Sequence, residues 1–236
     1  MRTQILATLL ALASPLPPVA ADPVSPVVLV ELYTSQGCSN CPPADEMIAE
    51  LAQRDDVLPL ALHVDYWDYI GWADSFADPR HTDRQKAYAR VARSRSLYTP
   101  QLVVGGVDQV NGFKPMRLVD LIARHRSEGA PAGIVAETEG DVVRLHSRPG
   151  AGALVAGDVN VDLVRFAETR TVEILHGENA GKTITYANIV TGWERVGRWD
   201  GLGEFAFTPE VRQDGALAVV VQAEGPGEVL AAFRLR

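Results

Sequence analysis

The chain has 236 residues, of which 30 are Asp or Glu and 22 are Lys or Arg, so its formal net charge is −8. Hydrophobic residues make up 47% of it, which is enough to build proper cores in one large or two small domains. The acidic balance argues against a nucleic-acid partner, because binding to phosphates requires a basic surface.

Residues 1–21 have the pattern of a secretory signal peptide. Arg2 supplies the positive start, residues 5–13 form an apolar core, and Val19-Ala20-Ala21 is a small-residue cleavage site. The apolar core is too short to span a bilayer, and the prolines between positions 15 and 18 argue against the alternative of an uncleaved anchor. We therefore expect a periplasmic or secreted protein, if the source is bacterial, with no membrane attachment after signal cleavage.

The only two cysteines of the chain, Cys38 and Cys41, lie in the stretch 27–45. Residues 27–32 are apolar except for Glu31, a pattern that predicts a strand buried on both faces, and the apolar spacing after the cysteines predicts a helix packed on the sheet. The cysteines then lie where a strand delivers the chain to a helix N-terminus. Unpaired N–H groups and the helix dipole stabilise a thiolate there.

This arrangement indicates thiol–disulfide exchange. Cys38 at the turn is the expected nucleophile, and Cys41 lies close enough to attack a mixed disulfide on Cys38 and release the partner. We expect Cys38 to be the more exposed and more acidic thiol. An inert structural disulfide and a metal site are the alternatives. Zinc usually requires four ligands, and the chain has no second cysteine pair to supply them.

A second buried strand is predicted over residues 57–64, parallel to the first because a helix connects them. His63 within it is expected to be a satisfied core histidine rather than a ligand. The following loop, 65–79, holds five aromatic residues and four aspartates, whose spacing matches no calcium loop. Its aromatic residues, which include Tyr66 and Trp67, have two possible roles. They line a groove for a peptide or protein substrate beside Cys38, or they act as a staple, packing the loop onto the domain.

The remaining pattern predicts two domains. A helix is expected over 80–96, a hairpin over 102–113 around Gly105-Gly106, and an amphipathic helix over 115–126. Short alternating strands with Gly, Pro and Asp turns follow from residue 134 and favour a β-sandwich. We therefore expect a first domain over 22–131 and an all-β domain over 132–236. The second has no cysteine, so we expect it to bind or position a partner.

The order of strand, C-x-x-C, helix, strand, helix, Thr-Pro, hairpin and helix resembles the thioredoxin fold over residues 27–126. More closely, E-L-Y-T-S-Q-G-C-S-N-C-P-P-A-D, H-V-D-Y-W-D-Y-I-G-W and Y-T-P-Q are similar to secreted bacterial thioredoxin-like proteins of unassigned function. The similarity extends into G-E-N-A-G-K-T near Gly177. The resemblance implies an α/β fold class: a thioredoxin-like domain followed by a smaller, sandwich-like all-β domain.

The resemblance also implies roles for single residues. Cys38 matches the attacking cysteine, Cys41 the resolving one, and Pro100 the cis-proline whose geometry turns the Thr99 backbone toward the cysteines to pair with a substrate strand. Glu31 lies on the strand where thioredoxins carry a buried acid for proton transfer, although its offset to the first cysteine is one residue longer here.

Two hypotheses about function follow from the sequence. The first is an exported thiol–disulfide oxidoreductase that acts on protein or peptide thiols, with no cofactor and no metal. The alternative is a thioredoxin-fold binding protein without turnover, which holds either a partner protein or a soft metal such as Cu(I) through its two thiolates.

Overall fold

The computed structural model describes residues 21–129, 133–148, 158–210 and 215–235. The predicted signal peptide, apart from its last residue, and the predicted domain boundary at residue 131 lie outside these residues. In chain order the elements are β1 (Asp22–Val24), β2 (Val28–Thr34), α1 (Pro42–Leu51), β3 (Val57–His63), a 3-10 turn (Asp68–Ile70), α2 (Pro79–Val91), β4 (Gln101–Val104), β5 (Asp108–Asn111), α3 (Pro115–Glu128), β6 (Ile134–Glu139), β7 (Val142–Ser147), β8 (Val159–Glu173), β9 (Thr183–Trp199), β10 (Glu204–Phe207), β11 (Ala216–Gln222) and β12 (Val229–Arg234).

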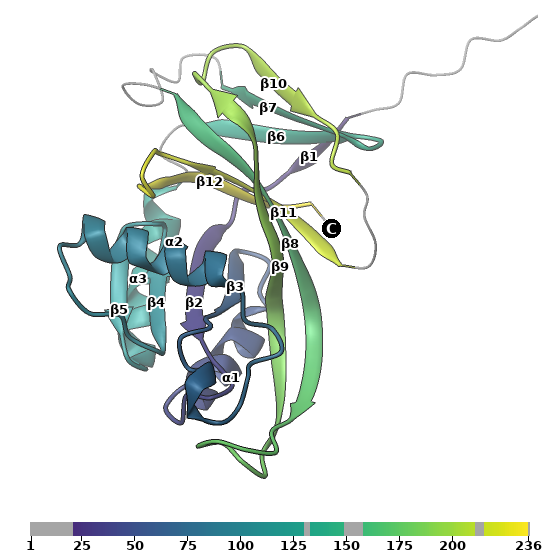
Figure 1. Cartoon of the computed structure of the whole chain (residues 1–236). Helices are drawn as coiled ribbons and strands as arrows, with labels where there is room; N and C mark the ends of the chain where they lie inside the picture. Colours follow the sequence, from purple (N-terminus) through teal and green to yellow (C-terminus); the bar gives the residue numbers. More distant parts are fainter. Residues whose placement is uncertain (1–20, 130–132, 149–157, 211–214, 236) are drawn as a thin grey trace, which may run out of the picture.

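The described chain is mixed α/β, with few helices and with its strands in two sheets (Figure 1). The larger sheet has eight strands in the order β12-β11-β8-β9-β3-β2-β4-β5. As predicted, β2 and β3 are parallel, and β4 and β5 form a hairpin. β9 joins β3 in parallel at Ala61 and Ile189. This last pairing places both halves of the chain in one sheet, which the sequence pattern does not reveal.

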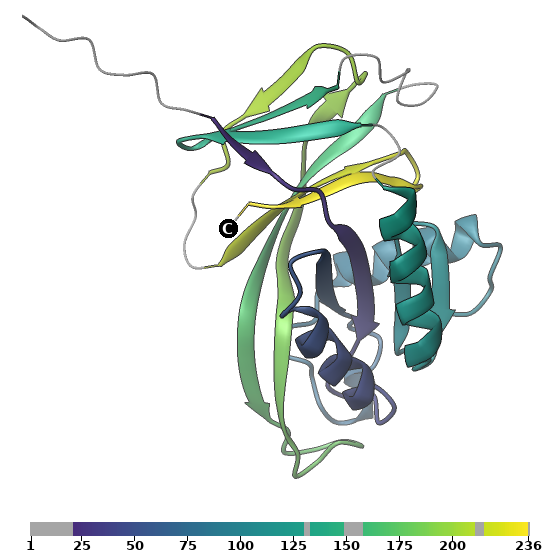
Figure 2. The ribbon, with the colours of Figure 1, turned by 180° about the vertical axis from the view of Figure 1, so that it is seen from behind.

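Helices cover both faces of the helical half of this sheet. Figures 1 and 2 show α2 on one face and α1 with α3 on the other. Alternation along β2 explains the arrangement, because Val30 and Leu32 pack with α1 and α3, whereas Leu29 and Tyr33 pack on the side of α2. Among the described residues, no helix has both the length and the apolar character needed to cross a membrane.

The smaller sheet has the order β1-β6-β7-β10 and packs on the β8, β11 and β12 part of the larger sheet. Ala136 and Leu145 from the smaller sheet share one buried cluster with Val161 and Val219 from the larger one. β1 pairs with β6, so a strand from the predicted first domain belongs to the sheet of the second. The division into two domains stays a prediction, and the packing crosses the proposed boundary.

β8 and β9 form a long antiparallel hairpin of 15 and 17 residues. One end lies beside the smaller sheet, and the other runs past β3 to a tip at residues 174–182 near α1 (Figure 1). Asn188 fastens β9 to β3, because its side-chain Nδ2 donates to the backbone oxygen of Pro59 at 2.8 Å. The hairpin therefore places residues from late in the sequence beside the turn that follows β2, which contains the two cysteines.

Candidate functional site

Cys38 and Cys41 lie in the turn between β2 and α1 and form a disulfide. Cys41 is the N-cap of α1, and prolines occupy the first two helical positions, where a missing N–H costs little. The backbone N–H of Cys38 donates to the oxygen of Ser35 at 3.1 Å, and that of Cys41 donates to the oxygen of Cys38 at 3.1 Å. The cysteines therefore occupy the strand-to-helix junction that the sequence predicts.

Both cysteines are buried, with 1% of Cys38 and 0% of Cys41 exposed. In the disulfide form neither cysteine is exposed, so the expectation that Cys38 is the more exposed and more acidic thiol of the reduced protein stays a prediction. The turn is covered by the tip of the β8–β9 hairpin, where the side-chain Nδ2 of Asn179 donates to the backbone oxygens of Gln36 and Cys38, each at 2.9 Å. Sequence reasoning missed this contact, although the motif G-E-N-A-G-K-T that contains Asn179 stood out as part of the resemblance.

The predicted substrate-binding residues gather beside the turn. Trp67 donates its indole N–H to the hydroxyl of Thr99 at 2.7 Å, and its Cβ would lie 3.4 Å from a Cβ placed on Gly37. The Thr99–Pro100 peptide bond is cis, as predicted. Trp67 therefore connects the residue before Cys38 with the residue before Pro100.

The aromatic loop is hydrogen-bonded to α2 and to the segment before the cysteines. Tyr66 donates its hydroxyl to Gln85 Oε1 at 3.1 Å, and burial raises the pKa of Tyr66 to about 12. Trp72 donates its indole N–H to Gln36 Oε1 at 2.8 Å. These contacts match the staple that the sequence offers as an alternative to a groove. Tyr69 is different, because 83% of it is exposed.

A cluster of buried polar side chains lies on the α1 side of the sheet, near the cysteine turn. The hydroxyl of Thr34 donates to Asp45 Oδ1 at 2.8 Å. Nδ1 of His63 lies 2.7 Å from Asp74 Oδ2, which also accepts the backbone N–H of Gln36 at 2.8 Å. Asp45 Oδ2 and His63 Nε2 are buried and have no hydrogen-bond partner among the described residues. The prediction that His63 is a satisfied core histidine is therefore met at one ring nitrogen only.

Asp45 lies one helical turn beyond Cys41. It follows Cys41 by four residues, and its backbone N–H donates to the oxygen of Cys41 at 3.1 Å, so the two side chains lie on the same face of the helix. Burial raises the pKa of Asp45 to about 7, while the charge of His63 and the hydrogen bond from Thr34 act in the opposite direction. A carboxyl that titrates near neutral pH at this place can take up or return the proton of a resolving thiol.

Glu31 lies on the other side of the sheet. Its carboxylate accepts hydrogen bonds from Arg84 Nε at 2.6 Å and from the Tyr88 hydroxyl at 2.6 Å, both on α2. Because side chains alternate along a strand, Glu31 and Thr34 point to opposite faces, and only Thr34 reaches Asp45. Glu31 thus bonds to α2 on the face of the sheet opposite Thr34 and Asp45, and the proton-transfer role that the resemblance implies for it stays a prediction.

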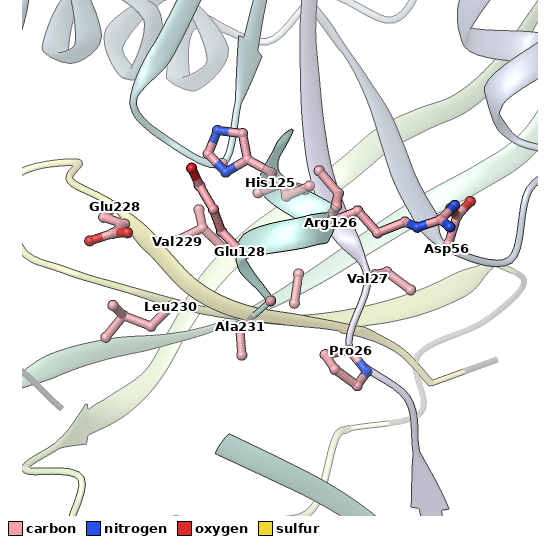
Figure 3. Close-up of a pocket in the computed structure, with 15 residues that line it drawn as sticks. Pro26, Val27, Asp56, His125, Arg126, Glu128, Glu228, Val229, Leu230 and Ala231 are labelled. Carbon is pink, nitrogen blue, oxygen red and sulfur yellow. The ribbon is translucent and has the colours of Figure 1, made fainter. Parts of the chain in front are cut away.

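Other possible sites lie elsewhere or are missing from the described chain. Within residues 21–129, 133–148, 158–210 and 215–235, no group of three or more His, Cys, Asp or Glu is placed to hold a metal ion. A cavity of about 220 Å³ lies between α3 and β12 (Figure 3). It borders Val28 and Leu29 at the start of β2, whereas the cysteines follow the end of that strand. Its lining includes Arg126, which pairs with Asp56 at 2.8 Å, but neither cysteine, so the cavity is separate from the disulfide.

Comparison with known proteins finds a family of unknown function and similar solved structures. The family model described as "Protein of unknown function (DUF1223)" matches residues 29–222, which include the cysteines and the hairpin tip. A crystal structure of a protein from Agrobacterium tumefaciens is 33% identical, with a TM-score of 0.72, over 88% of this chain and 93% of that one. HBP35 of Porphyromonas gingivalis is 13% identical, with a TM-score of 0.60 over 90% of this chain and 76% of that one, a likeness of fold alone. No curated protein matches the chain.

Proposed function

The chain belongs to the DUF1223 family of proteins of unknown function, and from its cysteine site we propose that it is an exported thiol–disulfide oxidoreductase acting on protein or peptide thiols. The main support is the disulfide between Cys38 and Cys41 at a strand-to-helix turn, with the carboxyl of Asp45 one helical turn beyond Cys41. A purely structural cross-link would close only a very short loop, which constrains the unfolded chain little.

We further propose that residues 27–128 have a thioredoxin-like fold. The support is the element order β2-α1-β3-α2-β4-β5-α3, with β2 between a parallel neighbour, β3, and an antiparallel neighbour, β4. Pro100 immediately precedes β4, where the resemblance places the proline that opens the hairpin strand. Export is supported by the signal pattern of residues 1–21 and by the disulfide, because disulfides persist in oxidising compartments outside the cytosol.

In the proposed reaction, the reduced protein donates two electrons to a substrate disulfide. The thiolate of Cys38 attacks one sulfur, the substrate S–S bond breaks, and the second substrate sulfur leaves as a thiolate that takes a proton from water. Cys41 then gives its proton to the carboxylate of Asp45 and attacks the sulfur of Cys38. The bond from Cys38 to the substrate breaks, the first substrate sulfur leaves as a thiolate, and the Cys38–Cys41 disulfide forms. The reverse sequence oxidises a substrate dithiol.

The surroundings of Asp45 suit this step. Asp45 interacts electrostatically with His63 and Asp74 of the same buried cluster, with Tyr186 on β9, and with Glu46, its neighbour on α1. Burial disfavours the charged carboxylate, so the proton taken from Cys41 is held readily at neutral pH. The unpaired Oδ2 atom is the oxygen of this carboxyl that is free to accept it.

The test uses the chain from residue 22 onward and a peptide with a single internal disulfide as substrate. We expect Cys38→Ser to abolish exchange and Cys41→Ser to accumulate a mixed disulfide on Cys38, measured by mass spectrometry after acid quenching. Ser39→Ala, an exposed position between the two cysteines, is the matched control. Failure of the wild-type dithiol to exchange with any disulfide would overturn the proposal, and stoichiometric retention of Cu(I) in that case would favour the metal-binding alternative.

A further inference from the structure

The tip of the β8–β9 hairpin is a compact loop that binds the cysteine turn from outside. Within the tip, the backbone N–H of Gly181 donates to the oxygen of Ile174 at 2.7 Å, and that of Ile174 donates to the oxygen of Lys182 at 2.9 Å. Nζ of Lys182 donates to Asn179 Oδ1 at 2.8 Å. The loop therefore holds the amide of Asn179 in one orientation, with its Nδ2 directed at the cysteine turn.

Two adjacent residues of the tip form hydrogen bonds with backbone groups around Cys38. Asn179 is buried and satisfies the backbone oxygens of Gln36 and Cys38, whereas the exposed Glu178 accepts the backbone N–H of Ser39 at 3.3 Å. With the tip in place, the N–H of Ser39 and these two carbonyl oxygens are therefore already hydrogen-bonded within the chain and do not face an incoming substrate unpaired. Glu178 also adds a negative charge beside the cysteine turn, which repels anionic substrates.

The tip is also packed against the aromatic loop. The rings of Trp72 and His176 have their centroids 6.3 Å apart, and a Cβ on Gly177 would come within 3.3 Å of the Trp72 Cβ. Trp72 in turn donates its indole N–H to the side-chain oxygen of Gln36. The hairpin tip therefore contacts both the cysteine turn and the aromatic loop. Side chains, rather than strand pairing, make the contacts to the cysteine turn.

We propose that Glu178 and Asn179 select the substrates of the Cys38–Cys41 pair, which is reached only when the hairpin tip leaves the cysteine turn. The disulfide is almost fully buried with the tip in place, so a substrate must take over the Ser39 N–H and the Gln36 and Cys38 carbonyls. The favoured class is then an extended, flexible peptide segment of neutral or positive charge. This inference rests on the proposed oxidoreductase function and names its substrate class.

The first experiment measures how fast dithiothreitol, a small neutral reductant, reduces the disulfide of the intact oxidised chain. Asn179→Ala removes two hydrogen bonds and should raise the rate about tenfold or more by increasing the open population. Asn179→Asp keeps the size and the contact to Lys182 but loses the donor, and it should raise the rate as well. Near-ultraviolet circular dichroism checks that both variants stay folded. Rates equal to that of the wild type in both folded variants would overturn the gating role.

The second experiment tests the charge preference with two disulfide peptides of equal length, one flanked by lysines and one by glutamates. We expect the wild type to react several-fold faster with the lysine peptide at low salt, and the preference to shrink at high salt. Glu178→Gln should abolish it, whereas Glu168→Gln, an exposed acid on the same hairpin but outside the tip, should preserve it. An unchanged preference in Glu178→Gln would overturn the selection role. Absence of any exchange in the wild type would instead overturn the proposed function.

Discussion

Replacement of Asp45 by asparagine tests the buried carboxyl next to Cys41 through the stability of the protein. Asparagine keeps the shape and the oxygen that accepts from Thr34, but it does not titrate. The pKa of Asp45 is raised from 3.8 to about 7 in the folded chain, so the folded state holds this proton more tightly than the unfolded state does. Stability from this group is fully present below the unfolded pKa and is lost as the pH rises toward the folded pKa.

The size of the effect follows from the shift. At roughly 1.36 kcal/mol per pKa unit, the difference between about 7 and 3.8 corresponds to about 4 kcal/mol of unfolding free energy, lost by the wild type between about pH 4 and pH 7. Asp45→Asn loses none of it through this site. The variant should therefore become more stable relative to the wild type as the pH rises, and the difference should level off above about pH 7.

Urea unfolding of the oxidised protein at a series of pH values from 4 to 8 measures this difference. Glu46→Gln is the matched control, because Glu46 is the next residue of α1 and is exposed. The control should follow the wild type across the series. A difference between Asp45→Asn and wild type that stays constant over the whole range would refute the assignment of a buried carboxyl with a raised pKa, and with it the proton-transfer role proposed for Asp45.

Three further substitutions test the contacts of α2, of β9 and of the hairpin tip through their effects on stability or on disulfide chemistry. Arg84→Met should cost about 3 kcal/mol or more in urea unfolding, because it leaves Glu31 buried without its cation, yet disulfide exchange by the folded protein should keep its wild-type rate. Asn188→Ala should cost about 1 kcal/mol and speed disulfide reduction by dithiothreitol, because β9 loses its bond to Pro59. Gly177→Ala should cost about 1 kcal/mol or more, read from thermal unfolding, because a side chain there needs φ near 77° and crowds the neighbouring tryptophan.

Local sequence pattern was enough for the elements around the cysteines. The apolar runs predicted β2 and β3, and their connection through a helix predicted that they are parallel, because a crossover of that kind brings the chain back in the same direction. The spacing of Cys38 and Cys41 between a strand and a helix predicted their disulfide chemistry as a hypothesis, and the structure joins them in a disulfide. The resemblance predicted the cis bond at Pro100. All of these except the cis bond, which rests on the resemblance, depend on neighbours in the chain.

The surroundings of the cysteines were decided by contacts that are remote in sequence. Asn179 and Cys38 are 141 positions apart, and nothing in the periodicity of either segment indicates that one covers the other. The alternation rule does say that Glu31 and Thr34 point to opposite faces of β2. It does not say which face α1 covers, and that choice makes Asp45, rather than Glu31, the carboxyl beside Cys41. Periodicity determines which side chains are buried, whereas the partner that buries each of them depends on the register of strands brought together only by folding.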